Sequence, residues 1–148
     1  MVRFKCRYVV LELVYEDDKT DLSLTTRDLL NALRDIIQTI HGEFGAAQVR
    51  HLSAKYLNVH SRTAVVKCGI KSYRTLLSAM PFVRHLRRLP CTVRSLRLAG
   101  TLRSCQKFIA KRNVIKLKEC LEKCITPVER RRVEEILNDS LKIDLGRR

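Results

Sequence analysis

Aromatic side chains are scarce in this sequence, and long hydrophobic runs are missing. The chain has no tryptophan, four tyrosines and four phenylalanines in 148 residues. Modules that read single-stranded RNA by stacking need paired aromatic rings on their strands, so the composition argues against that class. No apolar run approaches the roughly 18 residues of a membrane-spanning helix. Charged residues also stand at the N-terminus where a signal peptide would be apolar, so we expect a cytoplasmic or nuclear protein with no membrane partner.

Acidic residues are missing from half of the chain. No Asp or Glu occurs between Glu43 and Glu119, whereas that stretch contains seventeen Lys and Arg residues. The whole chain has a formal net charge of +15. Because solvated surfaces normally mix both signs, this segregation predicts a surface that accepts phosphates without a repelling carboxylate nearby. A membrane-surface binder and a merely basic domain are the alternatives that charge alone leaves open.

Catalytic and metal-binding motifs are also lacking. The six cysteines form no C-x-x-C pair, and no P-loop, G-x-G-x-x-G or G-x-S-x-G motif occurs. Cys120 and Cys124 lie one helical turn apart and could offer two metal ligands, although small residues facing a core are the commoner reading. The acids at residues 16–21 are typical of a loop. We therefore expect no catalytic residue, and no metal or cofactor, in the protein itself.

The first half of the chain predicts a strand, a helix and a hairpin. Residues 3–15 are rich in β-branched and aromatic side chains and contain no breaker. Thr25 or Thr26 can cap a helix, with Asp28 favourable in its first turn. Apolar residues then recur at helical spacing as far as Ile40, and we expect the glycines at 42 and 45 to end this helix. Residues 47–59 and 62–68 follow as a hairpin.

The second half predicts a short helix, a strand and further helices. Residues 71–80 suit a helix that Pro81 ends, and residues 91–98 suit a fourth strand. Thr101 and Thr126 are credible caps for two later helices. The order indicates an α+β fold, a ferredoxin-like βαββαβ sandwich with additional C-terminal helices. We expect an RNA-binding domain over residues 1–112 and a helical extension over 113–148 that packs on it.

Basic and polar side chains on these elements form the candidate RNA site. Residues 3, 5 and 7 alternate along one strand face, where they could contact phosphates or simply be a solvated edge. Tyr56 could stack on a base, although such a residue is more often packed. The free N–H groups that follow the turn at residues 100–101 could hold a phosphate. The predicted RNA-binding residues are Arg3, Lys5, Arg7, Tyr56, Asn58, Arg94, Arg97, Gly100, Thr101, Arg103 and Lys107.

Four short segments resemble a known family. They are MVRFK with RY at residues 1–8, HGEFGAA at 41–47, YLN at 56–58 and GTLRSCQKF at 100–108. Together and in this order they are similar to the fifth processing-of-precursor (Pop-five type) subunits of eukaryotic ribonuclease P and ribonuclease MRP. The resemblance extends to about residue 112. It departs at the end, where some relatives carry an acidic tail and this chain has Leu145-Gly146-Arg147-Arg148.

This resemblance implies a ferredoxin-like sandwich and an accessory role in a nuclear, largely nucleolar ribonucleoprotein. The catalytic RNA of the particle would hold Mg²⁺ and perform the reaction. That reaction is 5′-leader removal from precursor tRNA in ribonuclease P and cleavage of precursor rRNA in ribonuclease MRP. The expected partners are the catalytic RNA, precursor tRNA nearby, and other protein subunits including a TIM-barrel subunit.

The leading hypothesis is a non-catalytic subunit that clamps the RNA backbone and braces the catalytic core. The main alternative is a free-standing RRM-like RNA-binding module, which would need the aromatic pattern that this chain lacks. A metal-dependent nuclease would need clustered carboxylates, which the basic stretch does not contain. A protein scaffold whose charge is incidental would tolerate charge reversal at Arg94 and Arg97.

Overall fold

The structure is a computed structural model that describes residues 4–16 and 21–145, with side chains as far as residue 138. Two compact units are present, Met1–Cys105 and Gln106–Arg148. The strands are β1 (Cys6–Tyr15), β2 (Ser53–Asn58), β3 (Thr63–Gly69), β4 (His85–Leu86) and β5 (Leu89–Ala99). The helices are α1 (Thr26–Gln48), α2 (Tyr73–Ala79), the 3-10 helix η1 (Met80–Phe82), α3 (Leu102–Lys123) and α4 (Pro127–Leu145). The boundary predicted at residue 112, and the packing of the extension on the sandwich, stay predictions.

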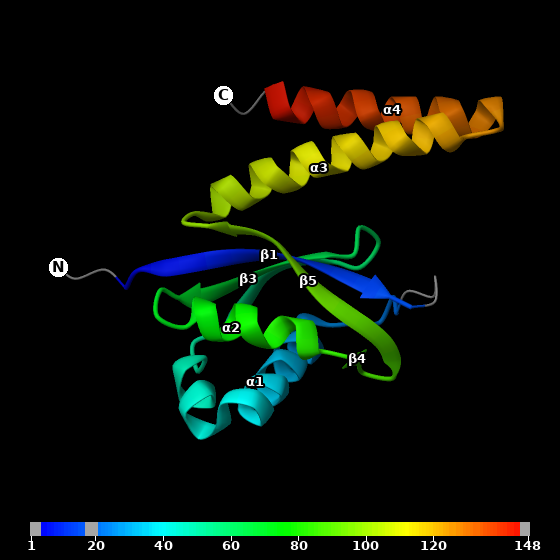
Figure 1. The fold of residues 1–148 in the computed structure, drawn as a ribbon. Coiled ribbons are helices and arrows are strands. Elements are labelled where there is room, and N and C mark those ends of the chain that lie inside the picture. Colours follow the sequence, from blue (N-terminus) through cyan, green and yellow to red (C-terminus); the bar gives the residue numbers. More distant parts are fainter. Residues whose placement is uncertain (1–3, 17–20, 146–148) are drawn as a thin grey trace. The chain divides into compact units, whose positions relative to one another are not determined.

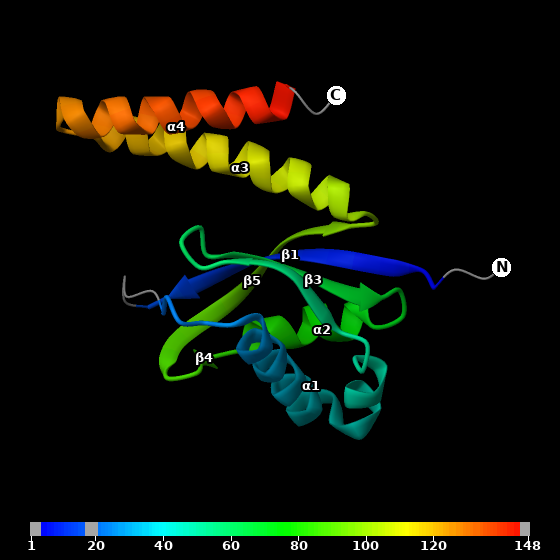
Figure 2. The ribbon, with the colours of Figure 1, turned by 180° about the vertical axis from the view of Figure 1, so that it is seen from behind.

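The first unit is an antiparallel sheet covered on one face by two helices (Figure 1). Its strand order is β2-β3-β1-β5-β4. Seen from behind, α1 and α2 again lie together on the same face of the sheet (Figure 2). This is the strand order and layering of a ferredoxin-like sandwich, so the predicted fold class is confirmed.

The core lies between the sheet and the two helices. Alternate residues of β1, namely Val9, Leu11 and Leu13, are buried in it against Leu29 and Leu33 of α1. Alternation along a strand and a spacing of four along a helix place these side chains on facing surfaces. Full burial of one such side chain stabilises the fold by about 2 kcal/mol. The hydrophobic pattern of the sequence therefore determines which face of the sheet meets α1 and α2.

Helix α1 begins where the sequence predicts but ends later. The Thr25 side chain accepts a hydrogen bond from the Asp28 N–H, and the Asp28 carboxylate accepts one from the Thr25 N–H, which completes a capping box. The prediction that the glycines end the helix holds only for Gly42, where the helical geometry is interrupted, since a further helical segment runs through Gly45 to Gln48. Gly42 alone leaves helical geometry, with φ 62° and ψ −158°.

Two strand predictions also need correction. The hairpin strand β2 begins at Ser53 rather than at residue 47, since residues 47 and 48 still belong to α1. The arginine-rich connection before Pro90 contains a further two-residue strand, β4, which pairs with the start of β5. The turn between these strands is tight, and Arg87 in it has φ 56°. A left-handed residue of this kind is unusual for a side chain other than glycine.

The second unit consists of the rest of α3 and of α4. Both views show α4 running back along α3 (Figures 1 and 2). Helix α4 begins at Pro127, directly after Thr126, as the sequence predicts. Ile125 in the connection is 95% exposed. Within the described part of the chain, none of the helices combines the length and the apolar character needed to cross a bilayer.

Candidate nucleic-acid interface

The face of the sheet that points away from α1 and α2 carries the candidate basic residues of β5. We call this face the second face. Strand register defines it: Arg97 pairs with Val10, Arg94 pairs with Glu12, and Val10 pairs on its other side with Val65. Because Val9, Leu11 and Leu13 point into the core, their neighbours on β1 must point to the second face.

A bulge in β5 brings Arg94 and Arg97 to the same face. Residues three apart on a regular strand point to opposite faces. Val10 pairs with Arg97 and the next residue, Leu11, pairs with Ser95. Leu96 between them therefore has no register partner on β1. The extra residue shifts the alternation of side chains along β5 by one position. Both arginine side chains therefore point to the second face. Both arginines are exposed.

A carboxylate lies on this same face. Glu12 is the register partner of Arg94, and its other partner on β3 is Thr63. The prediction of a surface without a repelling acid is therefore wrong for the second face. The cause is topology, because folding places a residue from the acidic N-terminal part of the chain in the middle of the basic stretch.

Tyr56 and Asn58 lie together on the second face, at the edge strand β2. Tyr56 pairs with Val65 and Asn58 with Thr63. The Asn58 amide donates a hydrogen bond to the Tyr56 hydroxyl over 3.2 Å, and its carbonyl oxygen accepts one from the Ser61 N–H over 3.1 Å. Asn58 thus closes the β2–β3 turn and orients the ring of Tyr56. Tyr56 is 38% exposed, so part of the residue is accessible to a ligand.

One further basic residue of the second face, Lys67, was not predicted. Lys67 pairs with both Tyr8 and Ser53, which places it on the same face as Arg97. The sequence could have indicated this position, because Ala64, Val66 and Cys68 alternate toward the core and Lys67 between them must point to the other face. The face is not open throughout, because Val10 and Val65 at its centre are buried. The groups accessible to a ligand are therefore those around this centre.

Arg7 points to the opposite face of β1 from the residues that pair with Arg94 and Arg97, and Lys5 lies just before β1. Arg7 pairs with Cys68, a residue of the core cluster, and is only partly exposed. Lys5 is exposed and its carbonyl accepts a hydrogen bond from the Ile70 N–H. Arg3 lies outside the described residues. Of the three predicted residues, the structure therefore describes two, Lys5 and Arg7, and neither lies beside Arg94 and Arg97.

Arg7 lies beside the turn that leads into α3. A side-chain carbon added at Gly100 would lie 3.9 Å from a guanidinium nitrogen of Arg7. Thr101 caps α3, since its hydroxyl accepts a hydrogen bond from the Ser104 N–H over 3.3 Å. The structure therefore brings Arg7, Gly100 and Thr101 together, next to the positive end of a helix that also carries Arg103. Lys107 follows Arg103 by one helical turn and belongs to the second unit.

Three cysteines of the first unit are buried and held neutral. Burial raises the pKa of Cys68 to about 11 and that of Cys91 to about 11, and it also raises the pKa of Cys105. Thiols held neutral in this way are poor nucleophiles and poor metal ligands. No group of three or more His, Cys, Asp or Glu side chains is placed to hold a metal in the part of the chain that the structure describes.

Residues 7–110 match the Rpp14/Pop5 family. The chain is 37% identical over 149 aligned positions to the ribonuclease P/MRP protein subunit POP5 of Mus musculus, covering 97% of this chain and 88% of that one. It is 36% identical to the subunit of the same name from Homo sapiens, with 97% and 91% covered. It is also similar to a chain in the cryo-EM structure of yeast ribonuclease MRP, with a TM-score of 0.52 and 18% identity over 84% of this chain and 99% of that one. At that identity the structural likeness supports the fold alone.

Proposed function

Because this chain belongs to the Rpp14/Pop5 family, we propose that it is a non-catalytic protein subunit of a ribonuclease P or ribonuclease MRP ribonucleoprotein. Its role is to bind and brace the catalytic RNA core. The RNA holds the Mg²⁺ and performs the chemistry, which is 5′-leader removal from precursor tRNA and processing of precursor rRNA. The particle is nuclear and largely nucleolar, and other subunits, a TIM-barrel protein among them, assemble with this chain.

The observation that carries the proposal is the β5 bulge. It places Arg94 and Arg97 on one face, within two register positions of each other along β1. Two arginine side chains at this separation can contact successive phosphates of one RNA strand, and each contact releases counterions. Lys67 extends the same face, and Arg7 with the capped start of α3 offers a second group of contacts. Neutralising phosphates at several points stabilises a compact RNA core that repels itself.

The RRM-like alternative receives less support from the same face. An RRM stacks bases on aromatic residues of its central strands. Here the residues that β3 presents to the second face are Thr63, Val65 and Lys67, none of them aromatic. Tyr8 on β1 and Tyr56 on β2 are the aromatic side chains of this face in the described strands. Of these two, only Tyr8 lies on a central strand, whereas an RRM uses aromatic residues on both of its central strands.

The function is tested by purifying a tagged copy from nuclei, sequencing the bound RNA and assaying the eluate on precursor tRNA. One abundant structured RNA, with leader cleavage that nuclease treatment abolishes, is the expected result. Recovery of many short unrelated RNAs without cleavage would instead identify a free-standing RNA-binding module.

The RNA contacts are tested by charge reversal. Arg94→Glu with Arg97→Glu should weaken binding of the recovered RNA to the purified chain and lower the salt slope of log Kd by about 2, because each lost phosphate contact removes nearly one counterion. The control is Arg74→Glu with Arg88→Glu, which changes the net charge equally at α2 and the β4–β5 turn. Equal losses in both double variants would mean that only net charge matters. No loss in either would favour a protein scaffold.

A further inference from the structure

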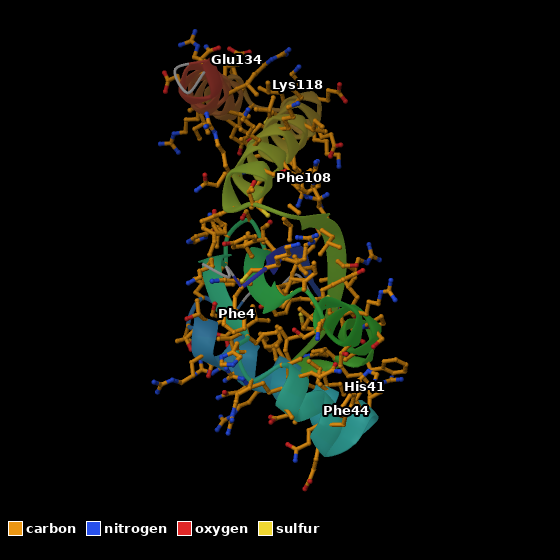
Figure 3. The ribbon with its side chains drawn as sticks, turned by 90° about the vertical axis from the view of Figure 1, so that its left-hand side faces the viewer. Phe4, His41, Phe44, Phe108, Lys118 and Glu134 are labelled. Carbon is orange, nitrogen blue, oxygen red and sulfur yellow. The ribbon has the colours of Figure 1, made fainter. Side chains whose placement is uncertain are left out.

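An exposed aromatic side chain projects from the last turns of α1. Phe44 is 74% exposed, and Ile40, which precedes the kink at Gly42, is 40% exposed. Figure 3 shows Phe44 and His41 together near the C-terminal end of this helix, beyond the layer of the sheet. We call Ile40, Glu43 and Phe44 the α1 tip. A phenylalanine has no polar group that gains from water, so such exposure is a cost unless another surface covers it.

The backbone of the α1 tip is specialised. Gly42 has φ 62° and ψ −158°, a region that is essentially restricted to glycine. Beyond this kink Gly45 is buried, and a side-chain carbon there would lie 2.3 Å from the Cβ of His41. The second glycine therefore lets the last turn pack closely against the preceding one. As a result Gly45 faces inward and its neighbour Phe44 faces outward.

Two side-chain hydrogen bonds hold this last turn on α2. His41 Nε2 and Ser78 Oγ lie 2.8 Å apart, and the Thr75 hydroxyl donates to the Gln48 side-chain oxygen over 2.7 Å. The bonds flank Phe44 on both sides along the chain. The exposed ring thus stands on a fixed base rather than on a frayed helix end. An anchor that is already ordered loses less conformational entropy on binding, which favours affinity.

The charge of this region differs from that of the rest of the molecule. Residues 35–49 contain Asp35 and Glu43 but no Lys or Arg, in a chain whose net charge is +15. The α2 side chains bonded to this segment, Thr75 and Ser78, are uncharged. The carboxylate of Glu43, next in sequence to the exposed Phe44, repels phosphates and suits a protein surface with Lys or Arg.

We propose that the α1 tip docks on a protein partner, with Phe44 filling an apolar pocket whose rim carries a Lys or Arg opposite Glu43. A second copy of this chain fits less well, because a symmetric contact would bring the acidic tip against itself. The inference assigns a protein interface on the helix-covered side, distinct from the proposed RNA contacts of the second face. It rests on the proposal that the chain acts within an assembly.

The contact is tested first by photocrosslinking. The photoreactive analogue p-benzoylphenylalanine replaces Phe44 in the full-length tagged chain, and the assembly purified from nuclei is irradiated. The expected product joins position 44 to a peptide of another protein, from an apolar surface site next to Lys or Arg. The same analogue at Phe82, which is 55% exposed on η1, is the matched control and should not give this product. A product with RNA, with a second copy of this chain, or none at all would overturn the proposal.

Energetics are tested with the partner identified in this way. Phe44→Ala should weaken its binding about 30-fold, as removal of a buried aromatic anchor does, whereas Phe82→Ala should have little effect. Glu43→Lys should also weaken binding of the partner. Replacing the partner's Lys or Arg opposite this position by Glu should restore the binding. RNA affinity of the free chain should not change in any of these variants. Unchanged partner binding by Phe44→Ala would overturn the inference. The RNA proposal is tested separately, because only the double variant Arg94→Glu with Arg97→Glu should lose RNA binding.

Discussion

At the scale of single residues, Arg87 connects two distant parts of the first unit. Its guanidinium lies 3.7 Å from the Asp21 carboxylate and 3.5 Å from that of Asp28, and it donates to the Ser23 carbonyl over 3.0 Å. These contacts tie the β4–β5 turn to the start of α1. They are exposed enough to be weakened by solvent, because the Arg87 side chain is 41% accessible.

Arg87→Ala should therefore lower the free energy of unfolding by about 1 kcal/mol, the upper range for an exposed ion pair. Urea denaturation followed by circular dichroism measures this difference. Arg88→Ala removes the same charge from the neighbouring position and is the control. If both variants lose the same stability, the loss does not come from the contacts with Asp21 and Asp28.

The acids that meet Arg87 also predict a dependence of stability on pH. Hydrogen bonds from Ser23 lower the pKa of Asp21, and hydrogen bonds from Thr25 lower the pKa of Asp28, each from an ordinary value of 3.8. A carboxyl whose pKa is lower in the folded state stabilises the fold above its unfolded pKa, and this contribution is lost as pH falls through the folded pKa. Urea midpoints should thus decrease below about pH 4. Asp28→Asn should make that decrease shallower, and an unchanged profile would contradict this assignment.

At the scale of secondary-structure elements, the kink in α1 depends on glycine at residue 42. A side-chain carbon there would contact nothing within 4 Å, so the cost of substitution is conformational rather than steric. Gly42→Ala should lower the free energy of unfolding by about 2 kcal/mol. Gly42→Asn should cost about as much, because ψ −158° lies outside the left-handed helical region that asparagine tolerates. Denaturation of both variants measures this, and a well-tolerated Asn would mean that the backbone there is left-handed helical.

Some elements could be predicted from the sequence because their signals are local. The capping box of Thr25 and Asp28 spans one helical turn, and it forms as the two residues predict. Helix α1 could not be bounded in the same way, because whether glycine ends a helix depends on what lies beside it. Gly45 stays helical since its missing side chain permits the contact with His41. Likewise, β4 is two residues long and forms only by pairing with β5.

The candidate site was less predictable than the fold for a related reason. Arg94 and Arg97 share a face only because β5 bulges against β1, and nothing within residues 91–98 alone indicates that bulge. Similarly, the partner of Arg94 is Glu12, more than 80 residues earlier in the sequence. Local patterns identify residue types and strand phase. Pairing across the sheet decides which charges become neighbours.

At the scale of the whole molecule, the reactivity of the cysteines can report on unfolding of the first unit. Cys68, Cys91 and Cys105 are buried in the first unit, whereas Cys120 in the second is exposed and Cys124 is partly exposed. Thiols react as thiolates, so burial that raises the pKa of Cys68 and of Cys91 to about 11 protects them twice, by access and by ionisation.

Alkylation of the native protein near pH 8, followed by mass spectrometry, should therefore modify Cys120 first and leave the three buried thiols intact. In a urea series Cys68 and Cys91 should become reactive together, at the midpoint of the circular dichroism transition, because both belong to one core cluster. Cys120 should react at the same rate before and after that midpoint. Modification of Cys68 well before Cys91 would contradict this expectation, because it would show that β3 separates from β1 while β5 is still paired.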